Sequence, residues 1–181
     1  IQRPLDANLA EKSAVRAVEI LQGFAESPEV SEGVQADLAL CYSNLAAIQA
    51  ADERTVDAID SYHSAIELRE SLLLKSPEVV QYRSELAASL NNLALLEIAT
   101  EDIASAVESF RYANHLFAAL MADFPDQVAY ASGWAALLNN QALALARIDR
   151  HEDAVAAYEQ AVEVQQRVSA QLQPSEAARQ T

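Results

Sequence analysis

The sequence predicts an all-α fold built from stacked helical repeats. The first observation is a short motif that recurs every 48 residues, as Asn44-Leu45-Ala46, Asn92-Leu93-Ala94 and Asn140-Gln141-Ala142. The second is composition, because 51% of the 181 residues are hydrophobic while only three are glycine and five are proline. Scarce glycine and proline argue against a turn-rich β fold. A fixed repeat of this length is typical of an array of stacked supersecondary units.

Prolines and short polar stretches at regular intervals separate the predicted helices. Proline ends a helix or occupies the first turn of the next one, and it occurs at Ser27-Pro28, Ser76-Pro77, Phe124-Pro125 and Gln173-Pro174. Midway between the prolines lie short polar stretches that indicate tight turns between two helices, namely Asp52-Glu53-Arg54, Thr100-Glu101-Asp102 and Asp149-Arg150-His151. In these turns, Thr100 and Asp149 are the residues expected to cap a helix.

These prolines and polar stretches predict seven helices, near residues 5–25, 30–50, 54–75, 78–99, 102–123, 127–148 and 151–172. The first helix matches the second helix of a repeat, because Ala10 and Ala17 lie one repeat length before Ala58 and Ala65. We therefore expect a single domain at residues 1–174, followed by a polar tail at residues 175–181. The domain would consist of a half repeat (5–25) and three full repeats (30–75, 78–123 and 127–172).

The first two repeats place a leucine and a small residue in the first helix, and the third has Gln141 in place of the leucine. All three place alanine, an aromatic residue and alanine in the second helix. The three copies are Leu45-Ala46, Ala58, Tyr62, Ala65; Leu93-Ala94, Ala106, Phe110, Ala113; and Gln141-Ala142, Ala154, Tyr158, Ala161. This pattern resembles the tetratricopeptide repeat. The resemblance covers about residues 35–172 and implies a right-handed α-solenoid of about seven antiparallel helices.

Two departures from the family pattern accompany the resemblance, in addition to Gln141 in the third repeat. The usual repeat has about 34 residues, and two added heptads would account for the longer unit while nearly preserving the inward face of each helix. The usual turn glycine is replaced by Glu53, Glu101 and Asp149. We therefore expect these turns to differ in detail from those of the family.

Long repeats with an Asn-Asn-Leu-Ala first helix resemble those of kinesin light chains. They resemble more closely the repeats attached to serine/threonine protein kinases in some bacteria. In these families the repeats bind peptides or proteins in a concave groove, so the resemblance implies a bacterial protein-binding scaffold. It also raises the hypothesis of a regulatory part of a larger enzyme. Because the chain begins at Ile1 rather than methionine, we expect it to be a fragment or a processed product.

The candidate peptide-binding residues lie on the first helices, which line the concave groove in this family. They are Asn44, Asn91, Asn92, Asn139, Asn140, Leu95, Ile98, Leu143 and Arg147. An exposed carboxamide offers both a donor and an acceptor to the backbone of a bound peptide, and the resemblance implies this role for Asn92. The alternative is that the asparagines bond across the repeat interface and hold its register. The mostly small and apolar floor suits an extended or helical segment with apolar side chains.

Three aromatic residues have two interpretations each. Trp134 lies near the start of the sixth predicted helix, and Tyr82 and Tyr130 share one repeat position. Packing between helices is the first interpretation. The second is a rim anchor for a ligand, since tryptophan is enriched at binding hot spots.

The formal net charge of -15 argues against nucleic acid and anionic membranes as partners, because both require a basic surface. The acidic residues either solvate the outer helix faces or attract a basic partner. No apolar run approaches the ~18 residues of a membrane span, and no signal peptide is visible. We therefore expect a cytoplasmic protein.

The sequence shows no pattern of catalytic or metal-ligating residues. His63, His115 and His151 stand apart, Cys41 is the only cysteine, and there is no glycine-rich phosphate loop. We therefore expect no catalytic residue, no metal, no cofactor and no enzymatic activity. The predicted partner is a protein or peptide. The alternative is a structural element that forms a homodimer through an exposed end of the helical stack.

Overall fold

The computed structural model describes residues 5–25 and 30–172 of the chain. Within them it contains seven helices and no strand, which confirms the predicted all-α class. Each predicted boundary lies within two residues of an observed one: α1 (Leu5–Ala25), α2 (Glu32–Ala51), α3 (Thr55–Lys75), α4 (Val80–Ala99), α5 (Ile103–Asp123), α6 (Val128–Arg147) and α7 (His151–Leu172). The expected polar tail at residues 175–181 lies outside the described residues.

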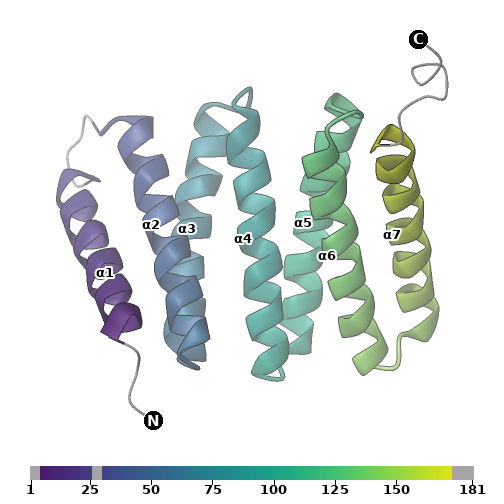
Figure 1. The fold of residues 1–181 in the computed structure, drawn as a ribbon, viewed down its shortest axis with the longest axis horizontal. Helices are drawn as coiled ribbons and strands as arrows, with labels where there is room; N and C mark the ends of the chain where they lie inside the picture. The colour runs from purple at the N-terminus through teal and green to yellow at the C-terminus, as the bar shows by residue number, and fades with distance from the viewer. Residues whose placement is uncertain (1–4, 26–29, 173–181) are drawn as a thin grey trace.

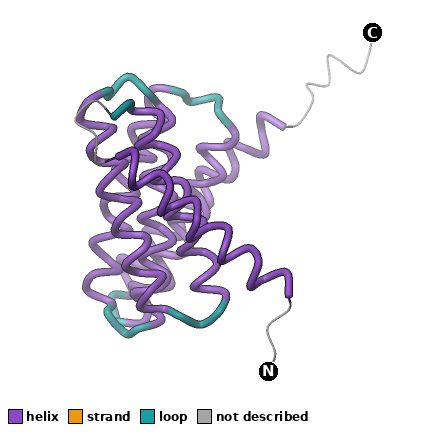
Figure 2. Tube along the Cα trace, turned by 90° about the vertical axis from the view of Figure 1, so that its left-hand side faces the viewer, coloured by secondary structure: helices purple, strands orange, loops and turns teal. Residues whose placement is uncertain are grey.

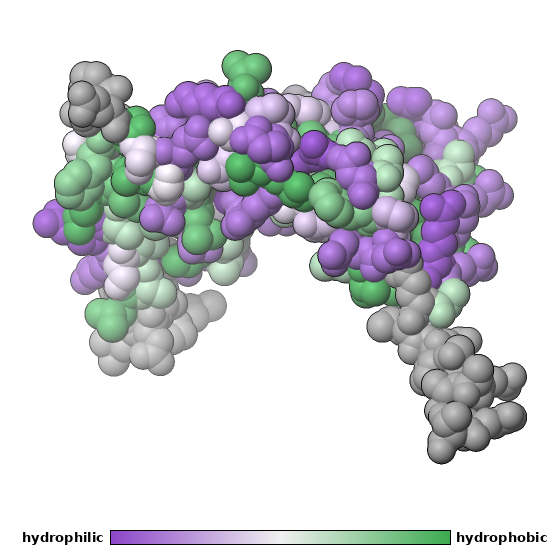
Figure 3. All heavy atoms as spheres, turned by 90° about the horizontal axis from the view of Figure 1, so that it is seen from above, coloured by the Kyte–Doolittle hydropathy of each residue, from purple (hydrophilic) through white to green (hydrophobic). Residues whose placement is uncertain are grey.

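Consecutive helices pack antiparallel, so that they form a row from α1 at one end to α7 at the other (Figure 1). The first helices of the three repeats, α2, α4 and α6, form one layer, and α4 contacts both of the others. The second helices α3 and α5 lie behind this layer in Figure 1. Figure 2 shows the loops gathered at the two ends of the helices, away from both faces of the stack. Seen from above, the molecule is an arch whose hollow lies on the side of the first helices (Figure 3).

Small residues bring the helices of each repeat close together. Ala46, Ala94 and Ala142 are fully buried, and so are their partners Ala58 and Ala106 in the second helices. Burial of these alanines is what a close approach of two helix backbones requires, because a larger side chain would hold the axes apart.

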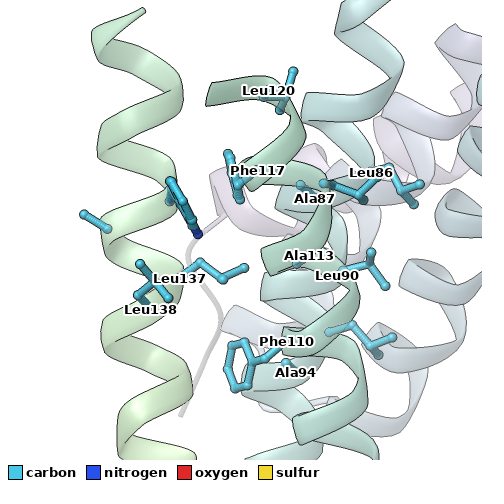
Figure 4. Close-up of a cluster of buried hydrophobic side chains, with 14 of the residues drawn as sticks. Leu86, Ala87, Leu90, Ala94, Phe110, Ala113, Phe117, Leu120, Leu137 and Leu138 are labelled. Carbon is cyan, nitrogen blue, oxygen red and sulfur yellow. The ribbon is translucent and has the colours of Figure 1, made fainter. Parts of the chain in front are cut away.

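Aromatic side chains of α5 fill the space beside the alanines. Phe110 is fully buried, and Phe117 is nearly so. Figure 4 shows both rings in the core, with buried side chains of α4 on one side of α5 and those of α6 on the other. The core is therefore continuous from one repeat to the next, which is how stacked units bury an apolar face that none of them can bury alone.

The turn within each repeat keeps the backbone conformation that favours glycine. Glu53, Glu101 and Asp149 have φ of 60°, 64° and 60°, which is the left-handed region. In the second turn the amide of Asp102 donates to the carbonyl of Glu97 at 2.8 Å, and the amide of Glu101 donates to that of Ile98 at 3.1 Å. This bond pair is the Schellman motif that ends many helices. The predicted departure from a glycine-type turn is therefore wrong for the backbone; only the residue type differs.

Of the two residues expected to cap a helix, Thr100 is a cap, at the C-terminal end of α4. Thr100 ends α4 rather than starting α5, and its hydroxyl donates to the carbonyls of Leu96 and Glu97. The N-cap of α5 is Asp102, whose carboxylate accepts from the amide of Ser105 at 3.2 Å. Asp149 occupies the left-handed turn position instead of capping α7. The polar stretches marked the turns correctly, but residue type alone did not distinguish the two sides of each turn.

Candidate functional site

The hollow side of the arch is formed by the first helices and carries exposed apolar side chains. Leu95 of α4 is 41% exposed and Leu143 of α6 is 57% exposed, and both occupy the same repeat position. Leu40 of α2 is exposed on the same layer. The repeat places these leucines on a helix face that packs against no second helix. We call this surface the groove. It is formed by the faces of α2, α4 and α6 that point away from the second helices.

A cavity of about 290 Å³ lies in the groove between α4 and α6. Its lining is Leu95, Ile98, Asn140, Leu143, Ala144 and Arg147, all from the two first helices. Five of the nine predicted site residues therefore meet around one cavity. Ala144 was not predicted, because it is buried and its small side chain gives no signal in the sequence that separates it from a packing alanine.

The remaining predicted residues, all asparagines, lie outside this cavity. Asn44, Asn92 and Asn139 are exposed on α2, α4 and α6, and Asn91 is half-buried. Asn140 donates from Nδ2 to Oδ1 of Asn91 at 3.0 Å, which joins α6 to α4. Asn91 in turn donates to Oδ1 of Asn92 at 3.3 Å. For the pair Asn91 and Asn140, the structure thus shows the bond across the repeat interface that was the alternative to peptide contact.

Asn92 has a structural contact of its own. Burial raises the pKa of Tyr62, and a hydrogen bond with Asn92 opposes that rise. The Tyr62 ring comes from α3 of the preceding repeat, and it is nearly fully buried. Asn92 therefore lies beside Tyr62 of the preceding repeat while its side chain stays exposed.

The three aromatic residues that had two interpretations serve packing. Trp134 is buried, and its Nε1–H donates to Oδ1 of Asn114 on α5 at 2.5 Å. Tyr130 meets Phe124 edge to face at a centroid distance of 6.1 Å. The hydroxyl of Tyr82 donates to the Glu32 carboxylate at 3.5 Å. These contacts tie neighbouring elements together, which is the structural interpretation of the aromatic positions.

Few charged groups line the groove. Arg147, in the last turn of α6, is the charged residue among those that line its cavity. In residues 5–25 and 30–172, no group of three or more His, Cys, Asp and Glu side chains is placed to hold a metal ion. In the same part of the chain, no helix is both long and apolar enough to cross a membrane. The cavity in the groove is thus a shallow, mostly apolar recess with one cation, Arg147, and one carboxamide, Asn140. The other carboxamides lie elsewhere on the first helices.

Comparison with known proteins identifies the repeat. Residues 134–169 match the family model of the tetratricopeptide repeat. Residues 134–169 carry a tetratricopeptide repeat. The matched segment lies inside the α6–α7 hairpin, and both helices of the hairpin extend beyond it. This agrees with a tetratricopeptide unit that is lengthened in each helix. The finer likeness to kinesin light chain repeats stays a prediction.

One solved structure is similar to this chain in fold, and two others are matched with lower TM-scores. A crystal structure of MamA has a TM-score of 0.52 and 14% identity, over 92% of this chain and 85% of that one. A chain described as a DHF58 filament has a TM-score of 0.42 and 20% identity, over 91% and 83%. MamA from residue 41 onward, from Desulfovibrio magneticus RS-1, has a TM-score of 0.34 and 14% identity, over 91% and 98%. The first of these shows the fold alone. No curated protein matches the sequence.

Proposed function

We propose that this chain is a protein-interaction module that binds an extended or helical segment of a partner protein in the groove. The observation that carries the proposal is the cavity between α4 and α6, whose lining includes the exposed Leu95 and Leu143. Leaving two leucines in water on a rigid helical surface forgoes the free energy that their burial against a partner would contribute.

The size and chemistry of the cavity favour a side-chain anchor over a whole small ligand. Its volume of about 290 Å³ lies just below the range of roughly 300–1,000 Å³ for drug-sized ligands. An apolar side chain of a partner segment would fit between Leu95, Ile98 and Leu143. The guanidinium of Arg147 can pair with a carboxylate of the same segment. The exposed carboxamides of Asn44, Asn92 and Asn139 can bind its backbone.

The resemblance to repeats attached to bacterial serine/threonine kinases supports a finer proposal, namely a regulatory part of a larger protein. In that case the partner segment would belong to the same polypeptide or to a substrate of its enzyme. The open reading frame upstream of Ile1 tests this: a reading frame without a catalytic domain would contradict it.

The groove proposal predicts the effect of a charge placed in the cavity. Peptides selected from a display library against the wild-type chain should be rich in apolar residues. Their affinity should fall by about tenfold or more in Leu143→Glu, because a partner side chain would have to be buried against a carboxylate. Affinity is measured by calorimetry, with far-UV circular dichroism to confirm that the variant folds.

Val56→Glu is the matched control, since Val56 is 68% exposed on α3, a second helix outside the groove. This control should leave the affinity unchanged. Equal affinities for Leu143→Glu and the wild type would refute the groove as the binding surface.

A second candidate function is self-association through the last helix. Tyr158 of α7 is 38% exposed, whereas Tyr62 and Phe110 at the same repeat position are 4% and 0% exposed. Val155 and Val162 continue an exposed apolar stripe along α7. Each inner repeat covers the corresponding stripe with the first helix of the next repeat, so that this end face lacks its neighbour among the described residues.

Light scattering over a concentration series tests the second candidate. If α7 mediates association, the average molecular mass of the wild type should rise with concentration. The Val162→Glu variant should keep the mass of a monomer at every concentration. A wild-type chain that stays monomeric at the highest concentration contradicts self-association. Leu143→Glu serves as the control, because a change in the groove should leave the mass curve unaltered.

A further inference from the structure

A second cavity, of about 410 Å³, lies on the opposite side of the array from the groove. It lies between the second helices α3 and α5, with α4 as its floor. Its lining is His63, Ile66, Leu90, Leu93, Glu97, Ala104, Ser105, Glu108 and Ser109. The residues at its rim, His63, Ala104 and Glu108, are exposed, whereas the floor residues are buried. We call it the outer cavity.

The floor of the outer cavity contains a buried carboxylate. Glu97 is only 7% exposed, and it accepts a hydrogen bond from the hydroxyl of Ser109 at 2.9 Å. Burial raises the pKa of the Glu97 carboxyl, and the charge of Asp102 acts in the same direction. The hydrogen bond from Ser109 and the nearby His63 oppose that rise. A carboxylate in this position is destabilising unless something compensates its lost hydration.

The other two repeats show that the fold does not require this acid. The position of Glu97 is taken by Gln49 in the first full repeat and by Leu145 in the third. Gln49 accepts a hydrogen bond from Ser61 at 2.7 Å, which reproduces the bond between Glu97 and Ser109 without a charge. Leu145 is buried in the same position. Packing therefore does not explain the charge of Glu97, because the residues at the same position in the other repeats pack without a charge.

The shape of the outer cavity, by contrast, belongs to the stacking itself. An equivalent cavity of about 280 Å³ lies between α5 and α7, and Leu145 and Ala157 line it in place of Glu97 and Ser109. At its rim Arg111 replaces His63. The repeat geometry thus makes a cavity at each of these two junctions, but only the one between α3 and α5 combines an apolar wall with a buried acid.

We propose that the outer cavity binds a cationic group on an apolar stem, such as the side chain of an arginine or lysine. Ile66, Leu90 and Leu93 would cover the stem, and the Glu97 carboxylate would accept hydrogen bonds from the charged head. The head would add a charged partner to the hydrogen bond that Glu97 accepts from Ser109. The net charge of -15 attracts cations to the surface around the rim. The source of the group is either a partner protein or a free organic amine.

Nuclear magnetic resonance titration of the isotope-labelled chain tests the proposal. The probes are N-acetyl-arginine methylamide, an arginine-containing peptide and a short alkyl diamine, and the neutral control is N-acetyl-citrulline methylamide. Saturable shifts are expected at the amides of Leu93, Ser105 and Ser109 for the cationic probes and not for the citrulline control. The peptide binding more tightly than the diamine would assign the site to a partner protein, and the reverse order would assign it to a free amine.

Two variants make the test specific. Glu97→Gln reproduces the residue that the first repeat holds in this position, so that it should fold normally and weaken the cationic probes by about tenfold. His63→Arg copies Arg111 of the neighbouring junction, and its guanidinium should compete with the probes at the rim. Shifts that do not saturate, equal binding of the citrulline control, or unchanged affinity in Glu97→Gln would each overturn the proposal.

Discussion

Replacing Phe110 by alanine is expected to lower the free energy of unfolding by about 3–5 kcal/mol. The Phe110 ring is fully buried in the continuous core of the array. Its removal opens a cavity beside Ala94 and Ala113, whose small side chains cannot expand to fill it (Figure 4). In a linear array each unit is stabilised by its neighbours, so the loss also weakens the interfaces on both sides of α5.

Tyr158→Ala is the matched control for Phe110→Ala, because Tyr158 occupies the same repeat position on the end helix. Its ring is 38% exposed, so its truncation should cost only about 1 kcal/mol. Urea titration followed by circular dichroism measures both variants. Equal losses in the two variants would show that the position, and not its burial by the next repeat, sets the energy.

The helices could be predicted almost completely from the sequence, and the reason is physical. Proline and short polar stretches interrupt helices wherever they occur, and the alanine and aromatic positions return at a constant interval. Ala46 and Phe110 occupy two of these recurring positions, and both are buried. The left-handed turn at Glu101 was not predicted, because a glutamate gives no sign of a conformation that favours glycine.

The groove residues were predictable to the extent that helical spacing determines which face of a helix a residue occupies. Leu95, Ile98, Leu143 and Arg147 share one face of the first helices and meet around one cavity. Spacing does not reveal which side chain of the next repeat lies opposite. The bond from Asn140 to Asn91 depends on such a neighbour, and so does the buried environment of Glu97. These features required the three-dimensional packing of the repeats.

The two sides of the array would serve different chemistry if both proposals hold. The groove cavity offers leucines and Arg147, which favour an apolar segment that carries an acid. The outer cavity offers Glu97 and Glu108, which favour a cation. Because α4 contributes to both cavities, coupling between them can be tested by titrating the arginine probe with and without a groove-binding peptide, and in Leu143→Glu the peptide should have no effect.

Replacing Arg69 by alanine is also expected to cost about 3–5 kcal/mol, because it breaks a buried polar network. Arg69 of α3 is 3% exposed. It donates to the hydroxyls of Ser43 on α2 and Ser89 on α4, and it lies 3.4 Å from the carboxylate of Glu85. Burial lowers the pKa of Arg69 and Glu85 opposes that effect. Without the guanidinium, the buried hydroxyl of Ser89, the half-buried hydroxyl of Ser43 and the Glu85 carboxylate each lose a charged partner.

The next junction shows an apolar alternative to this network. There Phe117 replaces Arg69, Leu137 replaces Ser89 and Gly133 replaces Glu85. A Cβ atom at Gly133 would lie 3.0 Å from two ring atoms of Phe117, so that a larger residue there would require the ring to shift. The two junctions thus use different side-chain sets at equivalent positions. Such sets would stabilise the correct order of repeats over a shifted pairing.

Transplanting the apolar set tests this explanation. The triple variant Arg69→Phe, Glu85→Gly and Ser89→Leu should recover most of the stability that Arg69→Ala loses, apart from about 1 kcal/mol for a glycine inside a helix. Arg69→Phe alone should remain destabilised, because the ring would meet the Glu85 side chain and remove the guanidinium that pairs with its charge. Urea titration of the three variants decides the matter. A triple variant no more stable than Arg69→Ala would contradict this explanation. It would mean that an apolar side-chain set cannot replace the charged network at this junction.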